Sequence, residues 1–435
     1  MTVVDVPPLQ REQEAGEEAM GTAAMRTAIA LAAAMAAVSA AGAARAGIAD
    51  GVVRIGVLND GTGPYADLSG PASVEAAKLA AEDFASTAGA AAAPFKVEIL
   101  YADHQNKADV GAEIVRRWVD VNGVGAVVDV PNTAVALAVN EVLRGKDRTF
   151  LASSVASSDL TGPKCAPTTV QWTFDTWALA HGTGSAITRD GGESWFFITA
   201  DYAFGQALER DTSEVVKANG GRVLGSVRTP LNTADFSSYL LQAQASQAKV
   251  IGFANAGADA TNAIKQAAEF GLAQGDRRLA GLLMFLTDVH SLGLQAAQGL
   301  LLTEAFYWDL DDATRAWSKR FAERVGGGRM PTMNHAGVYS SVLAYLRAVA
   351  SVRSDSGAAV VDEMKRAPVE DKLFGGTVTV RADGRAVHPM YLFQVKRPEE
   401  SKGAWDYYRL VATIPADEAF RPLDQGGCPL VAAKR

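Results

Sequence analysis

The sequence has few of the residues that build metal centres, disulfide-rich scaffolds and nucleic-acid surfaces. Its 435 residues include two cysteines and five histidines, and the formal net charge is -8. Two cysteines are too few for a disulfide-stabilised small fold. The acidic balance lacks the positive surface that nucleic-acid binding requires, so we predict no nucleic-acid partner. The 48% hydrophobic and 21% charged content is typical of a globular chain with room for two domains.

Signatures of common enzyme classes are also missing. The sequence contains no phosphate-binding G-x-x-x-x-G-K-S/T, no H-E-x-x-H zinc motif and no G-x-S-x-G nucleophile turn. The histidines do not have the spacing of metal ligands. We therefore predict that the protein is not an enzyme and that it has no catalytic residues, metal or cofactor.

Residues 1–46 have the pattern of an export signal that is removed. An apolar run at 28–38 follows a basic residue, and 44–46 read Ala-Arg-Ala, a small-x-small cleavage pattern. The run is too short to cross a bilayer as a mature helix. We predict cleavage after Ala46. Acidic residues at the start do not fit a signal, so we hypothesise that translation begins at Met20 or Met25.

The two cysteines, Cys165 and Cys428, both lie outside the signal region. Each is flanked by glycine and proline, which favour exposed loops. An oxidising compartment after export would permit a disulfide between them. Two separate buried thiols are the alternative, and the sequence leaves both interpretations open.

The stretch 52–84 predicts a strand, a polar glycine-rich loop and a helix. Its first residues form a near-continuous apolar run, as in a strand buried on both faces of a parallel sheet. Asn59 to Pro64 break that strand, and apolar residues recur at helical spacing after Pro71. Such a loop lies at the carboxyl end of the strands, where α/β sheets bind ligands.

The same alternation continues along the chain and predicts an α/β fold with two doubly wound lobes. Expected strands are 95–101, 124–130, 149–152, 195–199, 222–227, 250–253, 282–286 and 299–306, and expected helices are 108–121, 133–143, 178–188, 206–217, 236–246, 260–270, 314–324, 336–352 and 360–366. We read 168–175 as a crossover between the lobes. We also predict a ribbon of 375–380 and 390–395 joined by a turn at 382–384.

The loop after the first strand also matches a dinucleotide-binding fingerprint, G-x-G-x-x-A at 61–66. In that motif the helix opens within the glycines, whereas here Pro64 and the following residues delay it. The acidic residue expected about 20 positions further on is also missing. A nucleotide site is therefore the weaker interpretation.

Polar residues follow several of the predicted strands and are candidates for a binding site. In the first lobe these are Tyr65, Asn132, Thr133, Ser154 and Ala156, and in the second lobe Tyr202, Asn255 and Asp288. Hydroxyls and backbone N–H groups at helix N-termini can bind a carboxylate without a buried cation. Plain helix capping is the alternative for any single residue.

The order and spacing of several segments resemble the periplasmic solute-binding proteins of ABC transporters, of the leucine/isoleucine/valine-binding kind and type I fold. These segments are IGVLNDGTGPYADLSG, SSVASSDLTG, ITADYAFGQAL, QAAEFGL and GLLLTEAFYWD. The resemblance implies two lobes joined by three crossover strands, with a ligand cleft between them. We place the lobes at 47–172 with 306–377, and at 173–305 with 378–435.

The resemblance also assigns roles to the candidate residues. The loop at Asn132 and Thr133 and the backbone around Ser154 and Ala156 would hold a ligand carboxylate. Tyr202 would line the second lobe, and Asp288 falls near the acid that binds the ligand amine in the family. The context LTDVHSLG differs from that of the amino-acid binders, and CAPTTVQWTFDTWALAHGTG and FYWDLDD are closer to relatives that bind aromatic or other small organic acids.

We therefore expect a periplasmic, monomeric solute-binding protein that delivers a small ligand to inner-membrane ABC permease subunits. The ligand would be a branched-chain or hydrophobic amino acid or an aromatic acid. A nucleotide-dependent enzyme of doubly wound fold and a ligand-sensing domain without transport are the alternatives.

Overall fold

A five-stranded parallel sheet begins the fold in the computed structural model, which describes residues 48–87, 95–272 and 276–432. The strand order is β2-β1-β3-β4-β5. The strands are β1 (Val52–Asn59), β2 (Lys96–Asp103), β3 (Val124–Asp129), β4 (Thr149–Ala152) and β5 (Thr169–Gln171). Strands β3 and β4 are buried at every residue, as expected for strands covered on both faces.

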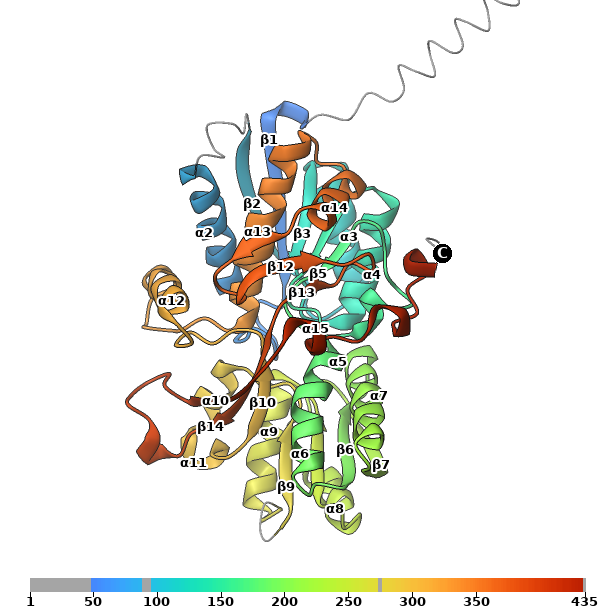
Figure 1. Cartoon of the computed structure of the whole chain (residues 1–435), viewed down its shortest axis with the longest axis vertical. Coiled ribbons are helices and arrows are strands. Elements are labelled where there is room, and N and C mark those ends of the chain that lie inside the picture. The colour runs from blue at the N-terminus through green and yellow to red at the C-terminus, as the bar shows by residue number, and fades with distance from the viewer. Residues whose placement is uncertain (1–47, 88–94, 273–275, 433–435) are drawn as a thin grey trace, which may run out of the picture. The chain divides into compact units, whose positions relative to one another are not determined.

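Helices cover both faces of this first sheet (Figure 1). Helices α3 (Ala108–Asp120) and α4 (Thr133–Gly145) pack on one face through Val115, Trp118 and Val135. The opposite face is covered by α2 (Ala72–Ser86), α13 (Met333–Val352) and α14 (Gly357–Arg366). Elements from two distant parts of the chain therefore cover this sheet.

A second parallel sheet, ordered β7-β6-β8-β9, forms the core of the other lobe. Its strands are β6 (Ser194–Ala200), β7 (Arg222–Thr229), β8 (Val250–Ala254) and β9 (Arg278–Gly281). Its helices are α5 (Thr176–Leu179), α6 (Ser185–Arg189), α7 (Ala203–Ala218), α8 (Ser237–Ala245), α9 (Gly257–Glu269), α10 (Leu286–Leu292) and α11 (Leu294–Ala297), with a π-helical turn at Ala180–Gly184. Both sheets place the loops after their strands at the edge where the lobes meet (Figure 1).

The remaining elements join the lobes. After β10 (Leu301–Glu304), helix α12 (Asp312–Val325) leads the chain back to α13 and α14. A small antiparallel sheet follows, made of β11 (Val369–Asp371), β12 (Gly376–Val380) and β13 (Ala386–Val387). Strands β14 (Met390–Val395) and β15 (Tyr408–Ile414) then pair with β10 in an antiparallel sheet.

Two predictions of strand structure are wrong. The predicted ribbon of 375–380 and 390–395 does not form. The chain turns at 382–384 after β12, but β12 pairs with β13, while β14 pairs with β10 and β15. The ribbon ends early because Pro389 has no N–H to donate and His388 is held by the carbonyl of Trp172. The strand predicted at 282–286 is absent: β9 ends at Gly281, residues 282–285 are buried outside any strand, and Leu286 begins α10. Their apolar character reflects burial beside the cavity described below.

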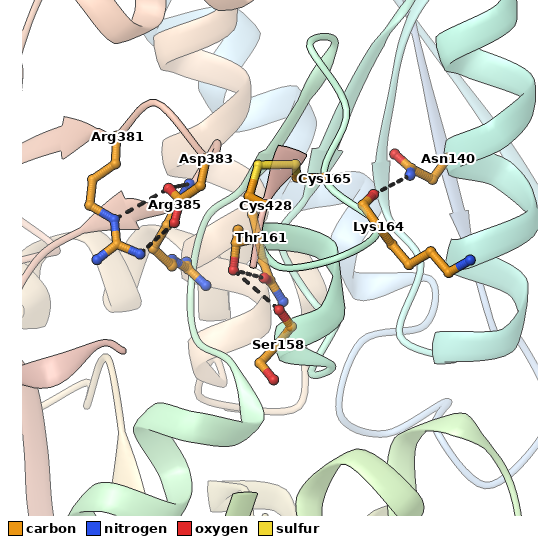
Figure 2. Close-up of a disulfide and its surroundings, with 10 residues drawn as sticks. Asn140, Ser158, Thr161, Lys164, Cys165, Arg381, Asp383, Arg385 and Cys428 are labelled. Carbon is orange, nitrogen blue, oxygen red and sulfur yellow. Dashed lines mark hydrogen bonds and ion pairs between the residues drawn. A yellow bond between two sulfur atoms is a disulfide. The ribbon is translucent and has the colours of Figure 1, made fainter. Parts of the chain in front are cut away.

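A segment after β15, residues 415–428, contacts both lobes. Cys428 forms a disulfide with Cys165, with 5.7 Å between their Cα atoms, beside the turn that holds Thr161 (Figure 2). The Arg421 guanidinium donates to Asp211 of α7 at 3.0 Å. The ring of Phe420 lies 4.5 Å from the guanidinium carbon of buried Arg385. The lobe limits expected from the sequence stay a prediction.

Candidate ligand-binding site

A small, partly open cavity lies between the lobes, beyond the carboxyl ends of both parallel sheets. Its lining residues are Tyr65, Leu68, Pro131, Ser154 and Ala156 from the first lobe, and Tyr202, Phe204, Ala256, Leu283 and Phe285 from the second. Carboxyl ends of parallel strands are where open α/β folds bind ligands. Larger surface hollows exist, such as the one bordered by Arg210, Arg381 and Arg421, but those arginines are paired with nearby acids.

Direct contacts between the lobes close the cavity on one side. The hydroxyl oxygens of Tyr65 and Tyr202 lie 2.5 Å apart, and the N–H of Ala258 donates to the carbonyl of Pro64 at 3.2 Å. Burial raises the pKa of both tyrosines, so both hydroxyls keep their protons at neutral pH. The structure therefore represents a closed arrangement of the lobes.

Gly257 permits the lobes to approach each other. Its φ angle is +56°, which favours glycine, and a Cβ atom there would lie 2.3 Å from the carbonyl oxygen of Pro64. That distance is shorter than any normal contact. The glycine therefore has a role at the lobe interface as well as at the start of α9.

The carboxylate of Asp129 organises the floor of the site in the first lobe. It is fully buried at the end of β3 and accepts hydrogen bonds from the Ser154 hydroxyl and from the Asn59 amide, the latter at 2.8 Å. Burial raises the pKa of Asp129 to about 6, although these hydrogen bonds act in the opposite direction.

The backbone after Asp129 is strained. Asp129 and Val130 have φ angles of +84° and +58°, and a β-branched residue rarely adopts such a conformation. Strain of this kind persists where surrounding contacts hold it, and it clusters at binding sites. Pro131, the next residue, lines the cavity just before α4 begins.

The predicted residues Asn132 and Thr133 lie at the N-terminus of α4, next to the cavity but outside its lining. The Asn132 side chain accepts from the N–H groups of Ala134 and Val135 and donates to Asn106 at 3.2 Å. The oxygen of its side chain is thus used by capping. The Thr133 hydroxyl is buried and has no partner within the described residues.

Donors for an anion are present in the loop after β4. The carbonyl of Ala156 accepts from Thr176, whereas the N–H groups of Val155 and Ala156 donate to no group in the part of the chain that the structure describes. Ala156 also lines the cavity. Unpaired N–H groups in a buried loop are suited to a carboxylate.

The predicted residues of the second lobe divide into two groups. Tyr202 lines the cavity, whereas Asn255 and Asp288 do not. Asn255 donates to Thr229 at 3.0 Å. Asp288 lies in the first turn of α10, and its carboxylate accepts from the N–H of Phe285 at 2.9 Å.

Asp288 lies near a second buried acid, Glu304. Burial raises the pKa of Asp288 to about 7, and burial also raises the pKa of Glu304. The Glu304 carboxylate accepts a hydrogen bond from the Tyr408 hydroxyl at 2.8 Å. The hydrogen-bond partner of the Asp288 carboxylate is the N–H of Phe285.

Sequence reasoning identified Tyr65, Ser154, Ala156 and Tyr202 among the lining residues. It did not identify Leu68, Pro131, Phe204, Ala256, Leu283, Phe285 or the supporting Asp129. The apolar ones resemble core residues in sequence. Asp129 carried a usable signal, because an acid that ends a fully apolar strand requires buried partners.

Within the described ranges, no helix is long and apolar enough to cross a membrane, and no cluster of His, Cys, Asp or Glu is arranged to hold a metal ion. Two parallel-sheet lobes with a small cavity between them define a two-lobed ligand-binding protein of type I fold.

Comparisons with known proteins agree with this class. The profile of the periplasmic binding protein family matches residues 52–404. A periplasmic binding protein from Burkholderia mallei is 46% identical with a TM-score of 0.83, and the match covers 87% of this chain and 99% of that one. The chain therefore belongs to the periplasmic binding protein family. A comparison with curated protein sequences gives no match.

Two further structures carry different descriptions. A branched chain amino acid ABC transporter periplasmic ligand-binding protein from Burkholderia xenovorans is 39% identical, with a TM-score of 0.76 over 87% of this chain and 99% of its own. A solute binding protein of an ABC transporter from Rhodopseudomonas palustris, in complex with 3,4-dihydroxybenzoic acid, is 18% identical, with a TM-score of 0.73 over 84% and 98%. The latter likeness shows the fold alone.

Proposed function

We propose that this protein is the exported solute-binding component of an ABC importer. It captures a small carboxylate-bearing ligand by lobe closure and presents it to inner-membrane permease subunits. The observation that carries the proposal is the small cavity between the lobes, to which each lobe contributes five residues. A site divided equally between two lobes couples ligand binding to closure.

The lining supports a ligand with an apolar body. Leu68, Phe204, Leu283 and Phe285 provide most of the apolar wall. No lysine or arginine lines the cavity, so a ligand carboxylate would be held by the N–H groups of the loop around Ala156. Branched-chain or hydrophobic amino acids and aromatic acids share this combination of a carboxylate and an apolar group.

Membership of a periplasmic family supports the proposed location. The signal predicted at 1–46 lies outside the described residues, and its removal after Ala46 is a proposal. We also propose that the ligand leaves unchanged and that the mature protein is monomeric. Release of an unchanged ligand distinguishes the proposed protein from a nucleotide-dependent enzyme.

Thermal unfolding with a ligand panel tests the proposal. The panel contains leucine, valine, phenylalanine, benzoate, 4-hydroxybenzoate and NAD, and native mass spectrometry identifies any molecule that co-purifies. A rise in Tm with an amino acid or aromatic acid, and none with NAD, is expected because ligands stabilise the state they bind. A rise with NAD alone would overturn the proposal.

A matched pair of variants locates the binding. Ala256→Leu adds three carbon atoms to a residue that lines the cavity, whereas Ala268→Leu adds the same group at an exposed position of α9. We expect the first variant to lose the ligand-induced rise in Tm and the second to keep it. Equal retention in both would place the ligand elsewhere.

A further inference from the structure

The hydrogen bond between Ser154 and Asp129 fixes the direction of one hydroxyl at the cavity wall. Ser154 lines the cavity, and its hydroxyl donates to one carboxylate oxygen of Asp129. The other carboxylate oxygen accepts from Asn59, whose amide also donates to the carbonyl of Gly70 at 2.7 Å. Both ends of the carboxylate are therefore engaged.

An ionised carboxylate accepts hydrogen bonds and cannot donate them. The single proton of the Ser154 hydroxyl is consequently committed to Asp129. Toward the cavity, the Ser154 oxygen can then act only as a hydrogen-bond acceptor, through its lone pairs. A ligand group that forms a hydrogen bond with Ser154 must therefore be the donor.

The geometry points to a specificity rule: Asp129 makes Ser154 a hydrogen-bond acceptor, so the cavity selects ligands that carry a donor in addition to their carboxylate. This inference rests on the proposed function. The donor is the ammonium of an amino acid or the ring hydroxyl of an aromatic acid, and the two sources share this chemistry. Asp129 is a positioning residue, because it acts through Ser154.

The rule moves ligand selection away from Asp288. The Asp288 carboxylate accepts from the N–H of Phe285 and does not line the cavity. The buried charge of Asp129 lies one hydrogen bond behind the cavity wall instead. That charge also repels a second anion at Ser154, so the ligand carboxylate belongs at the N–H groups near Ala156.

Matched ligand pairs test the rule by calorimetric titration. Each pair differs by one donor: 4-hydroxybenzoate with benzoate, and leucine with 4-methylpentanoate. We expect the wild-type protein to bind the donor-bearing member of one pair about 10-fold more tightly, the equivalent of one hydrogen bond. The pair that shows the preference identifies the source of the donor. Equal affinities within every pair that binds would overturn the rule.

Asp129→Asn reverses the hydrogen bond. Asn59 still needs an acceptor, so the Asn oxygen would face it and the new NH₂ group would donate to Ser154. The Ser154 proton is then free to point into the cavity. We expect the preference within the pair to fall to about 2-fold or less, because the acceptor is lost. Ser154→Ala, which removes the acceptor directly, should lower it similarly.

Asp371→Asn provides a matched control. Asp371 is a buried carboxylate that also accepts from a serine hydroxyl, that of Ser340, and it does not line the cavity. We expect this variant to keep the wild-type preference. A loss of preference in Asp371→Asn as large as in Asp129→Asn would show a general structural effect and overturn the rule.

A ligand-free measurement separates this inference from the proposed function. If none of the four compounds binds, the proposed ligand class fails. The inference is then decided by a crystal structure of the ligand-free wild-type protein. A Ser154 oxygen within hydrogen-bonding distance of Asp129 supports it, and a Ser154 hydroxyl turned away from Asp129 overturns it.

Discussion

The hydroxyls of Tyr65 and Tyr202 meet at 2.5 Å, although the residues are 137 positions apart and belong to different lobes. Replacing one tyrosine by phenylalanine leaves the other hydroxyl buried without its partner. Replacing both tyrosines removes both hydroxyls, so no unpaired hydroxyl remains. We expect Tyr202→Phe to destabilise the closed state by about 1–3 kcal/mol and the double variant Tyr65→Phe/Tyr202→Phe to be closer to the wild type. Small-angle scattering of the ligand-free proteins measures the radius of gyration, which increases on opening. A double variant more open than either single one would contradict this account.

Gly257→Ala should hold the lobes apart. The added Cβ would lie 2.3 Å from the Pro64 carbonyl oxygen, so the lobes must separate to make room. Gly220→Ala is the control, because Gly220 also has a positive φ of +82° but has no atom within 4 Å of the added Cβ. Both variants should lose about 1 kcal/mol of stability from backbone strain. Only Gly257→Ala should increase the radius of gyration, and an equal increase in both would exclude the steric explanation.

Asp288→Asn should change how stability depends on pH. The pKa of Asp288 is raised from 3.8 to about 7, so its contribution to stability is complete below pH 3.8 and is lost as pH rises to about 7. Asparagine does not ionise and can still accept from the N–H of Phe285. We expect the variant to exceed the wild type at pH 8 by up to about 4 kcal/mol in the free energy of unfolding, and to show no gain at pH 4. Urea unfolding across this range measures the difference.

Asp201→Asn in the same lobe is the control for that series, because Asp201 is exposed. Its difference from the wild type should stay near zero at every pH. A gain for Asp288→Asn that does not depend on pH would show that ionisation of Asp288 is not the cause.

Reduction of the disulfide should destabilise the protein. Cys165 and Cys428 are separated by 263 residues, and links across long loops restrict the unfolded chain most in the entropic account. We expect Cys428→Ser to lower the free energy of unfolding by about 2–5 kcal/mol. Cys165→Ser and the double variant should lose the same amount. Two titratable thiols in the denatured, unreduced wild-type protein would show that the link is absent.

The two-lobed α/β fold could be predicted from the sequence because buried parallel strands are continuous apolar runs bounded by polar loops. The stretch 52–84 shows this well, since its strand and helix became β1 and α2. The same reasoning failed at 282–286, where an apolar run lines a cavity instead of forming a strand. Hydropathy reports burial, and burial occurs in strands and in cavity walls alike.

Part of the site was also accessible from the sequence. Tyr65, Ser154, Ala156 and Tyr202 follow strands and line the cavity. Asn132 follows a strand too, but its side chain caps α4, and the alternative of plain capping describes its contacts. The direction of a hydroxyl proton depends on a partner far away in sequence, as with Ser154 and Asp129. Local pattern carries no information about such a pairing.

The disulfide also determines how the molecule responds to cleavage. It closes a covalent ring from Cys165 to Cys428 that contains all four strands of the second parallel sheet. A single cut in any loop inside that ring leaves both fragments attached. One proteolytic event therefore cannot release the second lobe, and a nicked protein would run as one piece until a reductant is added.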